Sequence, residues 1–173
     1  NQVVTTNGVS KSFAMTGWRL GYIGAPLHIA QACTKIQGQF TSGTSSISQR
    51  AAIAAVSADP SVIHSMRDAF LSRRDFILEE LNKIKGININ QPQGAFYVFP
   101  DVSAFFNKSY ENFTVNNSDQ LAMYILETAK VAVVTGNAFG SPNCIRISYA
   151  SSMEKLKDAM DRIATSHIHF SFE

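Results

Sequence analysis

A long helical pattern in the middle of the sequence divides the chain into two parts. Asp59 and Pro60 form a strong helix start, because aspartate is a good N-cap and proline is favoured at the first helical position. Apolar residues then recur at intervals of three and four, and Gly86 supplies a stop signal. Such a helix would be about 40 Å long at about 1.5 Å per residue. The pattern predicts three regions, at 1–59, 60–86 and 87–173.

Strand and helix signals alternate on both sides of this helix. In the N-terminal part we expect strands at 2–6 and 19–24, helices at 26–39 and 47–58, and a turn at Asn7-Gly8. In the C-terminal part we expect strands at 87–90, 95–100, 130–134 and 144–150, and a loop over 101–117. We also expect two helices there: one is capped by Asn117 or Ser118, and the last begins with a capping box of Ser151 and Glu154. The alternation is typical of an α/β protein, with helices on a mixed sheet in the C-terminal part.

The segment GVSKSFAMTGWRLG at 8–21 contains a lysine and an arginine on glycine-rich backbone. Lys11 lies just beyond the first expected strand, where ligands bind in open α/β sheets. An amine condenses with an aldehyde only in its uncharged form, which a second cation or a desolvated pocket favours. Arg19 stays charged, and its planar fork binds phosphate oxygens. The pair therefore suits a cofactor with an aldehyde at one end and a phosphate at the other.

Ordinary surface roles are the alternatives for both residues. A lysine beside serines in a glycine-containing loop is commonly a solvated side chain, and Arg19 could be a charge at a strand edge. Spacing alone favours these alternatives.

A third cation lies near the end of the chain, in CIRISYA at 144–150. Alternation places Ile145, Ile147 and Tyr149 on one face of the expected strand and Arg146 on the other. An arginine is rarely buried on a strand unless an anionic group pairs with it. The alternative is an edge strand with a charged guard residue, which is common and which spacing alone favours.

Both segments resemble motifs of a known family. SKSFAMTGWRLGY resembles the lysine motif of the class I aminotransferases of pyridoxal-phosphate fold type I, in the form found in bacterial aspartate aminotransferases. The match includes the residues at the most constrained motif positions, which are Ser10, Lys11, Gly17, Arg19 and Gly21. The strand RISYA resembles the R-[LI]-S-[YF]-A strand near the C-terminus of the same family.

The resemblance implies a role for each of these residues. Lys11 corresponds to the catalytic lysine, which binds the aldehyde of pyridoxal 5'-phosphate and shuttles a proton at the substrate Cα. Arg19 corresponds to a ligand of the cofactor phosphate, and Ser10 to a cofactor-binding serine of the motif. Many relatives carry a hydroxyl three residues before the lysine, where this chain has Gly8. Arg146 corresponds to the arginine that binds the substrate α-carboxylate.

The resemblance covers nearly the whole chain, but only as the C-terminal part of a longer subunit. It implies the end of a large cofactor domain at 1–59, a bridging helix at 60–86 and a small α/β domain at 87–173. We expect an inactive fragment of a homodimeric enzyme that transfers an amino group between an amino acid, aspartate, and a 2-oxo acid, 2-oxoglutarate. The alternatives are a C–S lyase or decarboxylase on the same fold, and an aminotransferase-like sensor domain of a transcription regulator.

Composition excludes several other classes. The formal net charge is +2 with both signs interspersed, which predicts neither a nucleic-acid nor a membrane partner. No apolar run approaches about 20 residues, and no signal peptide is visible, so we expect a cytoplasmic protein. Cys33 and Cys144 lack CxxC spacing, which favours structural thiols. The histidines, including those of HIHF at 167–170, show no metal-ligand pattern, and no metal is expected.

Overall fold

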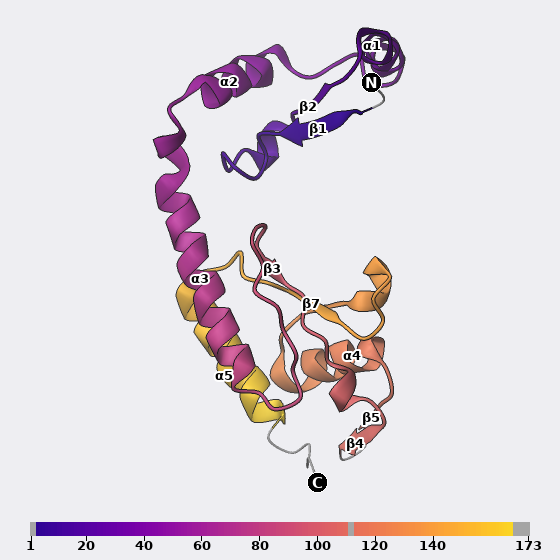
Figure 1. Ribbon diagram of the computed structural model, residues 1–173, viewed down its shortest axis with the longest axis vertical. Helices are drawn as coiled ribbons and strands as arrows, with labels where there is room; N and C mark the ends of the chain where they lie inside the picture. The colour runs from indigo at the N-terminus through magenta and orange to yellow at the C-terminus, as the bar shows by residue number, and fades with distance from the viewer. Residues whose placement is uncertain (1–2, 111–112, 168–173) are drawn as a thin grey trace. The chain divides into compact units, whose positions relative to one another are not determined.

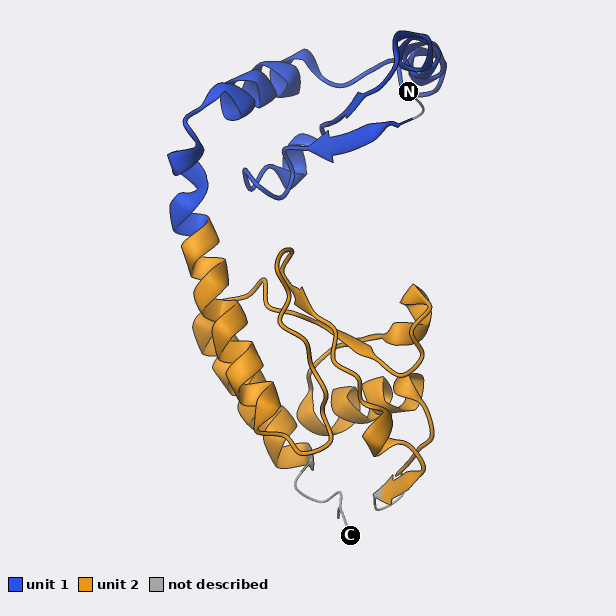
Figure 2. Ribbon diagram, viewed as in Figure 1, with its two compact units in different colours: residues 1–66 blue, residues 67–173 orange. Residues whose placement is uncertain are grey.

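The structure, a computed structural model, describes residues 3–110 and 113–167 (Figure 1). The chain separates into two compact units, Asn1–Met66 and Arg67–Glu173 (Figure 2). We call them unit 1 and unit 2. Their boundary lies inside helix α3 (His64–Asn82). The domain limits expected from the sequence, with a bridging helix at 60–86, stay a prediction.

Unit 1 begins with a β-hairpin. Strand β1 (Thr5–Gly8) pairs antiparallel with β2 (Gly21–Gly24), and Gly8 lies opposite Gly21. The expected turn at Asn7-Gly8 is therefore wrong, because both residues belong to the strand. A Cβ on Gly8 would lie 3.2 Å from the carbonyl oxygen of Leu20, and one on Gly21 would lie 3.3 Å from that of Asn7. Glycine at both positions lets the two backbones approach closely.

Unit 1 buries little apolar surface. Helices α1 (Leu27–Phe40) and α2 (Ser46–Ser57) follow the hairpin near the positions expected from the sequence. Among the described residues of this unit, the buried apolar side chains are Val9 and Ala52. Several large apolar side chains are more than half exposed, including Val3, Leu27, Ile36, Phe40 and Ile47. A two-stranded hairpin with so little covered surface is only marginally stable by itself.

The long helix starts as the sequence predicts. Asp59 is the N-cap, and its carboxylate accepts a hydrogen bond from the backbone N–H of Ser61 at 2.8 Å. Hydrogen bonding from the Ser61 side chain, and secondly from this N–H, holds the pKa of the Asp59 carboxyl below its usual value. The first turn is a 3₁₀ helix, η2 (Pro60–Ile63), which continues directly into α3. The helix ends at Asn82, somewhat before Gly86, whose φ of 93° lies in the left-handed region.

Unit 2 contains a three-stranded sheet in the order β3-β7-β6, formed by Tyr97–Val98, Ile145–Ser148 and Val134–Thr135. Both pairings are antiparallel, so the mixed sheet expected from the sequence is wrong on this point. For β6 and β7 the reason is their short connection through the 3₁₀ helix η4 (Gly136–Phe139), since such a short link reverses the chain direction. The expected strand at 87–90 is reduced to an isolated bridge of Asn88 with Asp101.

The remaining elements of unit 2 differ from expectation in two places. The expected loop at 101–117 contains a 3₁₀ helix and a hairpin, η3 (Ser103–Phe105), β4 (Lys108–Tyr110) and β5 (Phe113–Val115). Helix α4 (Ser118–Ala129) is capped by Asn117, which accepts from the N–H of Gln120. Helix α5 (Met153–His167) is capped by Ser152, not by the expected Ser151: the Ser152 hydroxyl accepts from the N–H of Lys155.

The core of unit 2 lies between the sheet and the helices α3, α4 and α5 (Figure 1). It is built from aliphatic and aromatic side chains that are almost completely buried, among them Ile77, Leu81, Val98, Phe105, Leu121, Tyr124, Ile145, Tyr149, Met160 and Ile163. Unit 2 therefore has the continuous hydrophobic core of an ordinary domain.

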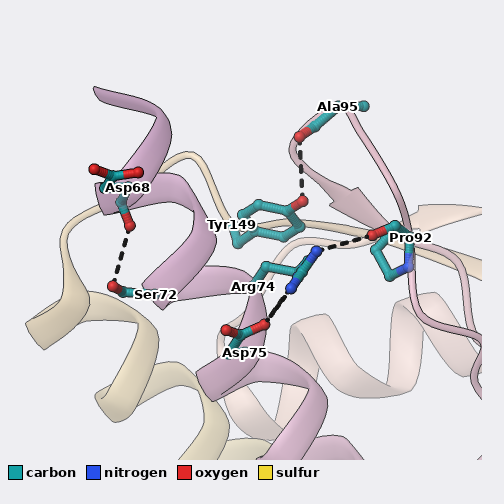
Figure 3. Close-up of polar contacts among 7 residues, drawn as sticks. All are labelled: Asp68, Ser72, Arg74, Asp75, Pro92, Ala95 and Tyr149. Carbon is teal, nitrogen blue, oxygen red and sulfur yellow. Dashed lines mark hydrogen bonds and ion pairs between the residues drawn. The ribbon is translucent and has the colours of Figure 1, made fainter. Parts of the chain in front are cut away.

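Two hydrogen bonds hold the loop before β3 in place (Figure 3). The Tyr149 hydroxyl donates to the carbonyl oxygen of Ala95 at 3.1 Å, and Arg74 of α3 donates to that of Pro92 at 3.3 Å. Burial raises the pKa of the Tyr149 hydroxyl. Arg74 is also paired with Asp75 at 2.7 Å. The loop is thus tied both to the helix and to the end of β7.

Candidate active site

Lys11 lies in the loop between the two strands of unit 1. Strand β1 ends at Gly8, and buried Val9 anchors the start of the loop. The backbone then turns through hydrogen bonds from the N–H of Phe13 to the carbonyl of Val9 and from the N–H of Met15 to that of Ser10, at 3.3 and 3.1 Å. The Lys11 side chain is exposed and Ser10 is half-buried. The loop therefore presents the amine at the surface of the unit, at the end of a strand.

Arg19 follows the short 3₁₀ helix η1 (Thr16–Trp18) in the same loop. Its backbone is left-handed, with φ 51° and ψ 50°. One guanidinium nitrogen, Nη1, donates to the carbonyl oxygen of Thr16 at 3.1 Å. Within residues 3–110 and 113–167, no carboxylate is paired with Arg19. The residue is exposed, and its other guanidinium donors can take an anionic ligand.

Arg19 lines an open cavity of about 840 Å³ in unit 1. Thr6, Thr34, Ser42 and Thr44 share this lining. The Thr34 hydroxyl donates to the carbonyl oxygen of Ala30 at 3.0 Å, so the candidate hydroxyl donors are those of Thr6, Ser42 and Thr44. A guanidinium beside several hydroxyl donors fits a phosphate group. Lys11 and Ser10 do not line the cavity, so the structure brings Arg19 to these hydroxyls without bringing the other two predicted residues there. Thr6 and Thr34 were not predicted, because isolated threonines in a strand and a helix carry no motif signal.

Arg146 lies on β7 in unit 2, opposite Val134 of β6. Its neighbours Ile145 and Ile147 are buried and Arg146 is half-buried, which confirms the expected alternation. The guanidinium lies 4.4 Å from the centre of the Tyr97 ring and 4.5 Å from that of Phe139. In the part of the chain that the structure describes, Arg146 forms no ion pair. The arrangement is a positive charge held between two rings with its donors available to an anion.

Sequence patterns did not identify Tyr97 as a site residue, and they favoured a packing role for Phe139. Tyr97 lies on β3, where it pairs with Ser148, so it reaches Arg146 only through the register of two strands far apart in the sequence. Phe139 lies in the GNAFG turn, and an aromatic residue beside glycine is usually a packing residue. Only the pairing of β3, β6 and β7 reveals that these two rings share one cation.

In the two described ranges, no group of three or more His, Cys, Asp and Glu side chains is placed to hold a metal ion. No described helix is both long enough and apolar enough to cross a bilayer. The HIHF segment at 167–170 extends beyond the described residues.

Comparisons with known proteins give a consistent result. The sequence model of a family described as aminotransferase class I and II matches residues 1–163. A bifunctional aspartate aminotransferase and glutamate/aspartate-prephenate aminotransferase of Petunia hybrida is 48% identical over 167 residues, covering 94% of this chain and 35% of that protein. An aspartate aminotransferase of Pinus pinaster is 47% identical, covering 95% of this chain and 34% of that protein.

The same similarity holds in three dimensions. The crystal structure of the aspartate aminotransferase from Rhizobium meliloti superposes with a TM-score of 0.91 at 41% identity, covering 94% of this chain and 41% of that one. This confirms the α/β fold class. The chain spans only about a third of the length of the two plant relatives. Because the family match extends over almost all of the sequence, the chain belongs to the class I and II aminotransferases.

Proposed function

We propose that this chain is the C-terminal part of a pyridoxal-phosphate-dependent enzyme that transfers an amino group from aspartate to 2-oxoglutarate. Its family, and the relatives named as aspartate aminotransferases, support this proposal. The observation on this chain that carries it is Arg146, a half-buried guanidinium between two rings without a carboxylate partner among the described residues. A group so arranged is suited to bind the carboxylate that every amino acid and 2-oxo acid carries.

Arg19 and the hydroxyl-bearing residues of the cavity fit the phosphate of the cofactor, whereas Lys11 and Ser10 lie in the same loop without lining that cavity. When bound, pyridoxal phosphate supplies an aldehyde for the amino group and a ring that withdraws electrons from the substrate Cα. We assign Arg19 and the nearby hydroxyls of the cavity to its phosphate, because they form a cationic, donor-rich lining. Lys11 would hold the cofactor through its Nζ and then accept and return the proton of the substrate Cα. Ser10, next to it, would contact the cofactor.

Arg146 would orient the substrate. Two parallel N–H donors of a guanidinium bind both oxygens of a carboxylate and fix its plane. This orientation decides which bond at Cα is exposed to the proton-accepting amine, and such positioning contributes a large part of an enzymatic rate. A further group must bind the side-chain carboxylate of aspartate, and we place that group outside the residues assigned above. Selection for aspartate therefore depends on that group.

Assembly and location complete the proposal. We propose a homodimer, in which a second subunit covers apolar surface that unit 1 leaves exposed. We also propose a cytoplasmic location, since both cysteines of the chain, Cys33 and Cys144, are free thiols, as is usual in reducing compartments.

Product analysis of the full-length protein tests the reaction. Incubation with aspartate, 2-oxoglutarate and pyridoxal phosphate should produce oxaloacetate and glutamate in equal amounts. A C–S lyase would instead release ammonia and pyruvate from a sulfur amino acid without consuming 2-oxoglutarate, and a decarboxylase would release carbon dioxide. A helix-turn-helix region in the sequence upstream of Asn1, together with no turnover, would favour the sensor domain and contradict the proposal.

A further inference from the structure

We infer that Tyr97 and Phe139 are positioning residues, whose rings hold the Arg146 guanidinium in the orientation in which it binds the substrate carboxylate. This inference rests on the proposed function of Arg146. It adds two residues that sequence patterns did not assign to the site, and it gives each a specific task.

The first support is the geometry around the cation. The two ring centres lie 4.4 and 4.5 Å from the central carbon of the guanidinium, both well within the range of cation–π attraction. A flat guanidinium stacks on aromatic faces, and two rings restrict it more than one ring does. An arginine side chain loses considerable conformational entropy when it is fixed. Because the rings already fix Arg146, less of that cost remains when a carboxylate binds.

The second support is that the Tyr97 ring is itself held by the sheet. Tyr97 pairs with Ser148 across β3 and β7, two positions along β7 from Arg146 and therefore on the same face of the sheet. The neighbouring N–H of Tyr149 donates to the carbonyl oxygen of Phe96 at 3.0 Å, which extends the pairing. The rings of Phe96 and Tyr97 also lie 4.4 Å apart. The backbone pairing and the contact with the Phe96 ring therefore hold the Tyr97 ring in place.

Phe139 is fixed from the other end of β7. It closes the helix η4, whose first residue, Gly136, donates its N–H to the carbonyl oxygen of Cys144 at 2.7 Å. A Cβ on Gly136 would collide with the carbonyl oxygens of Ser141 and Cys144, so the turn can pack this closely on the strand only with glycine. The Phe139 ring then meets Phe99 edge-on, with centres 5.9 Å apart and an interplanar angle of 88°.

A purely structural role explains Phe139 less well. The residue is 48% exposed, and it is not among the side chains of the unit 2 core. Packing in the core of unit 2 therefore does not account for this residue. Its contacts are instead with the cation and with Phe99, which supports a role in orienting Arg146.

The test compares variants of the full-length protein. Phe139→Leu and Tyr97→Leu keep an apolar side chain but remove the ring face, whereas Tyr97→Phe keeps the ring. Phe113→Leu is the matched control, because Phe113 packs on Tyr124 and does not contact Arg146. We expect each ring-removing variant to raise the KM for aspartate about three- to tenfold. Tyr97→Phe and Phe113→Leu should stay close to the unchanged protein.

A second substrate separates positioning from general damage. A simple alkylamine has no carboxylate. The rate at which it changes the absorbance of the bound cofactor should be the same in Phe139→Leu and Tyr97→Leu as in the unchanged protein. An equal loss with aspartate and alkylamine would overturn the inference, because a disturbed fold affects both. Arg146→Lys tests the proposed function itself. If it leaves the KM for aspartate unchanged, that proposal fails; if it raises the KM while both ring-removing variants behave normally, only the inference fails.

A measurement without turnover covers the case in which a variant does not fold. In the ¹⁵N spectrum of the 173-residue chain, the Nε–H signal of Arg146 can be assigned by its loss in Arg146→Lys. Two flanking rings should displace this proton signal upfield of the exposed arginines, and Tyr97→Phe should preserve the displacement. A signal at the position of exposed arginines in the unchanged chain would overturn the inference.

Discussion

Arg19 has a backbone conformation that few residues of its kind adopt. Its φ of 51° lies in the left-handed region, where a Cβ approaches the backbone and costs about 1 kcal/mol. Glycine or asparagine at this position would avoid or reduce this cost. Strained residues of this type concentrate at ligand sites, where the surroundings hold them. The same conformation is usual at a helix C-cap, which Arg19 is for η1 as Lys130 is for α4.

Replacing Arg19 should weaken binding of the cofactor more than binding of the substrate. In the full-length protein, Arg19→Asn should raise the Kd for pyridoxal phosphate about ten- to a hundredfold, because a charge-assisted bond to phosphate is lost while asparagine tolerates the left-handed backbone. Arg19→Lys, which keeps the charge but not the fork, should give a smaller increase. The measurement is a fluorescence titration with the cofactor. An unchanged Kd in Arg19→Asn would count against the phosphate assignment.

Replacing Lys11 should abolish both attachment and proton transfer. Borohydride reduction of the full-length protein with pyridoxal phosphate should attach the cofactor permanently to Lys11, which peptide mass mapping will locate. Lys11→Ala should lose the adduct and reduce kcat by several orders of magnitude, since the nucleophile and the proton carrier are lost together. Lys35→Ala, at an exposed position of α1, is the control and should behave normally. An adduct on another lysine would end this assignment.

At the scale of elements, the start of the long helix depends on one side chain. Asp59 satisfies the N–H of Ser61, and Pro60 has no N–H to satisfy. The chain can therefore enter η2 and α3 without an orphan donor in its first turn. The boundary between the two units lies soon after this start, at Met66 and Arg67.

Removing this cap should lower stability in a pH-dependent way. The pKa of Asp59 is lowered in the folded chain, so its ionised form contributes stability above the ordinary aspartate pKa. This contribution decreases as the pH falls through that value and is lost below the folded-state pKa. Asp59→Ala should therefore reduce the melting temperature near neutral pH and have a smaller effect at acidic pH. Asp59→Asn, which keeps an acceptor, is the control. A difference in melting temperature that grows on acidification would contradict the assignment.

At the scale of the whole molecule, the two units differ in how much they bury. Unit 2 has a continuous core shared by its sheet and helices, whereas the described part of unit 1 leaves both faces of its hairpin largely exposed. Lys11 and Arg19 belong to unit 1 and Arg146 to unit 2. The better-packed unit thus carries the proposed substrate residue, and the less-packed unit carries the proposed cofactor residues.

This difference predicts the behaviour of the 173-residue chain in isolation. Backbone amides of β7, α4 and α5 should resist hydrogen exchange, while those of β1, β2 and α1 should exchange quickly, because local stability follows buried apolar contact. Exchange measured by mass spectrometry on the intact chain checks this. The chain should show no transamination of aspartate with 2-oxoglutarate. Equal protection of both units, or measurable turnover by the pure chain, would contradict the prediction.

Local sequence patterns were sufficient for features that depend on neighbouring residues. The order of the main helices and strands, the N-cap Asp59 and the alternation around Arg146 follow from turn chemistry and periodicity. For α4 the sequence offered Asn117 or Ser118 as the cap, and the structure selects Asn117. The lysine motif at 8–21 likewise indicated the family, which the comparisons confirm. The roles of Lys11, Ser10, Arg19 and Arg146 stay predictions. The expected cap of the last helix, Ser151, differs from the observed cap, Ser152, by one residue, because either of two adjacent serines can cap a helix.

Tertiary structure decided what depends on residues far apart in the chain. The antiparallel direction of the sheet, the strand position of Asn7-Gly8 and the hydroxyl-rich cavity beside Arg19 all arise from pairing across loops. The two rings around Arg146 come from separate segments, and only the register of β3 with β7 and the close packing of Gly136 bring them together. The physical reason is that hydrophobic periodicity specifies which face of a strand is buried, whereas its partner is selected by burial and hydrogen bonding over the whole fold.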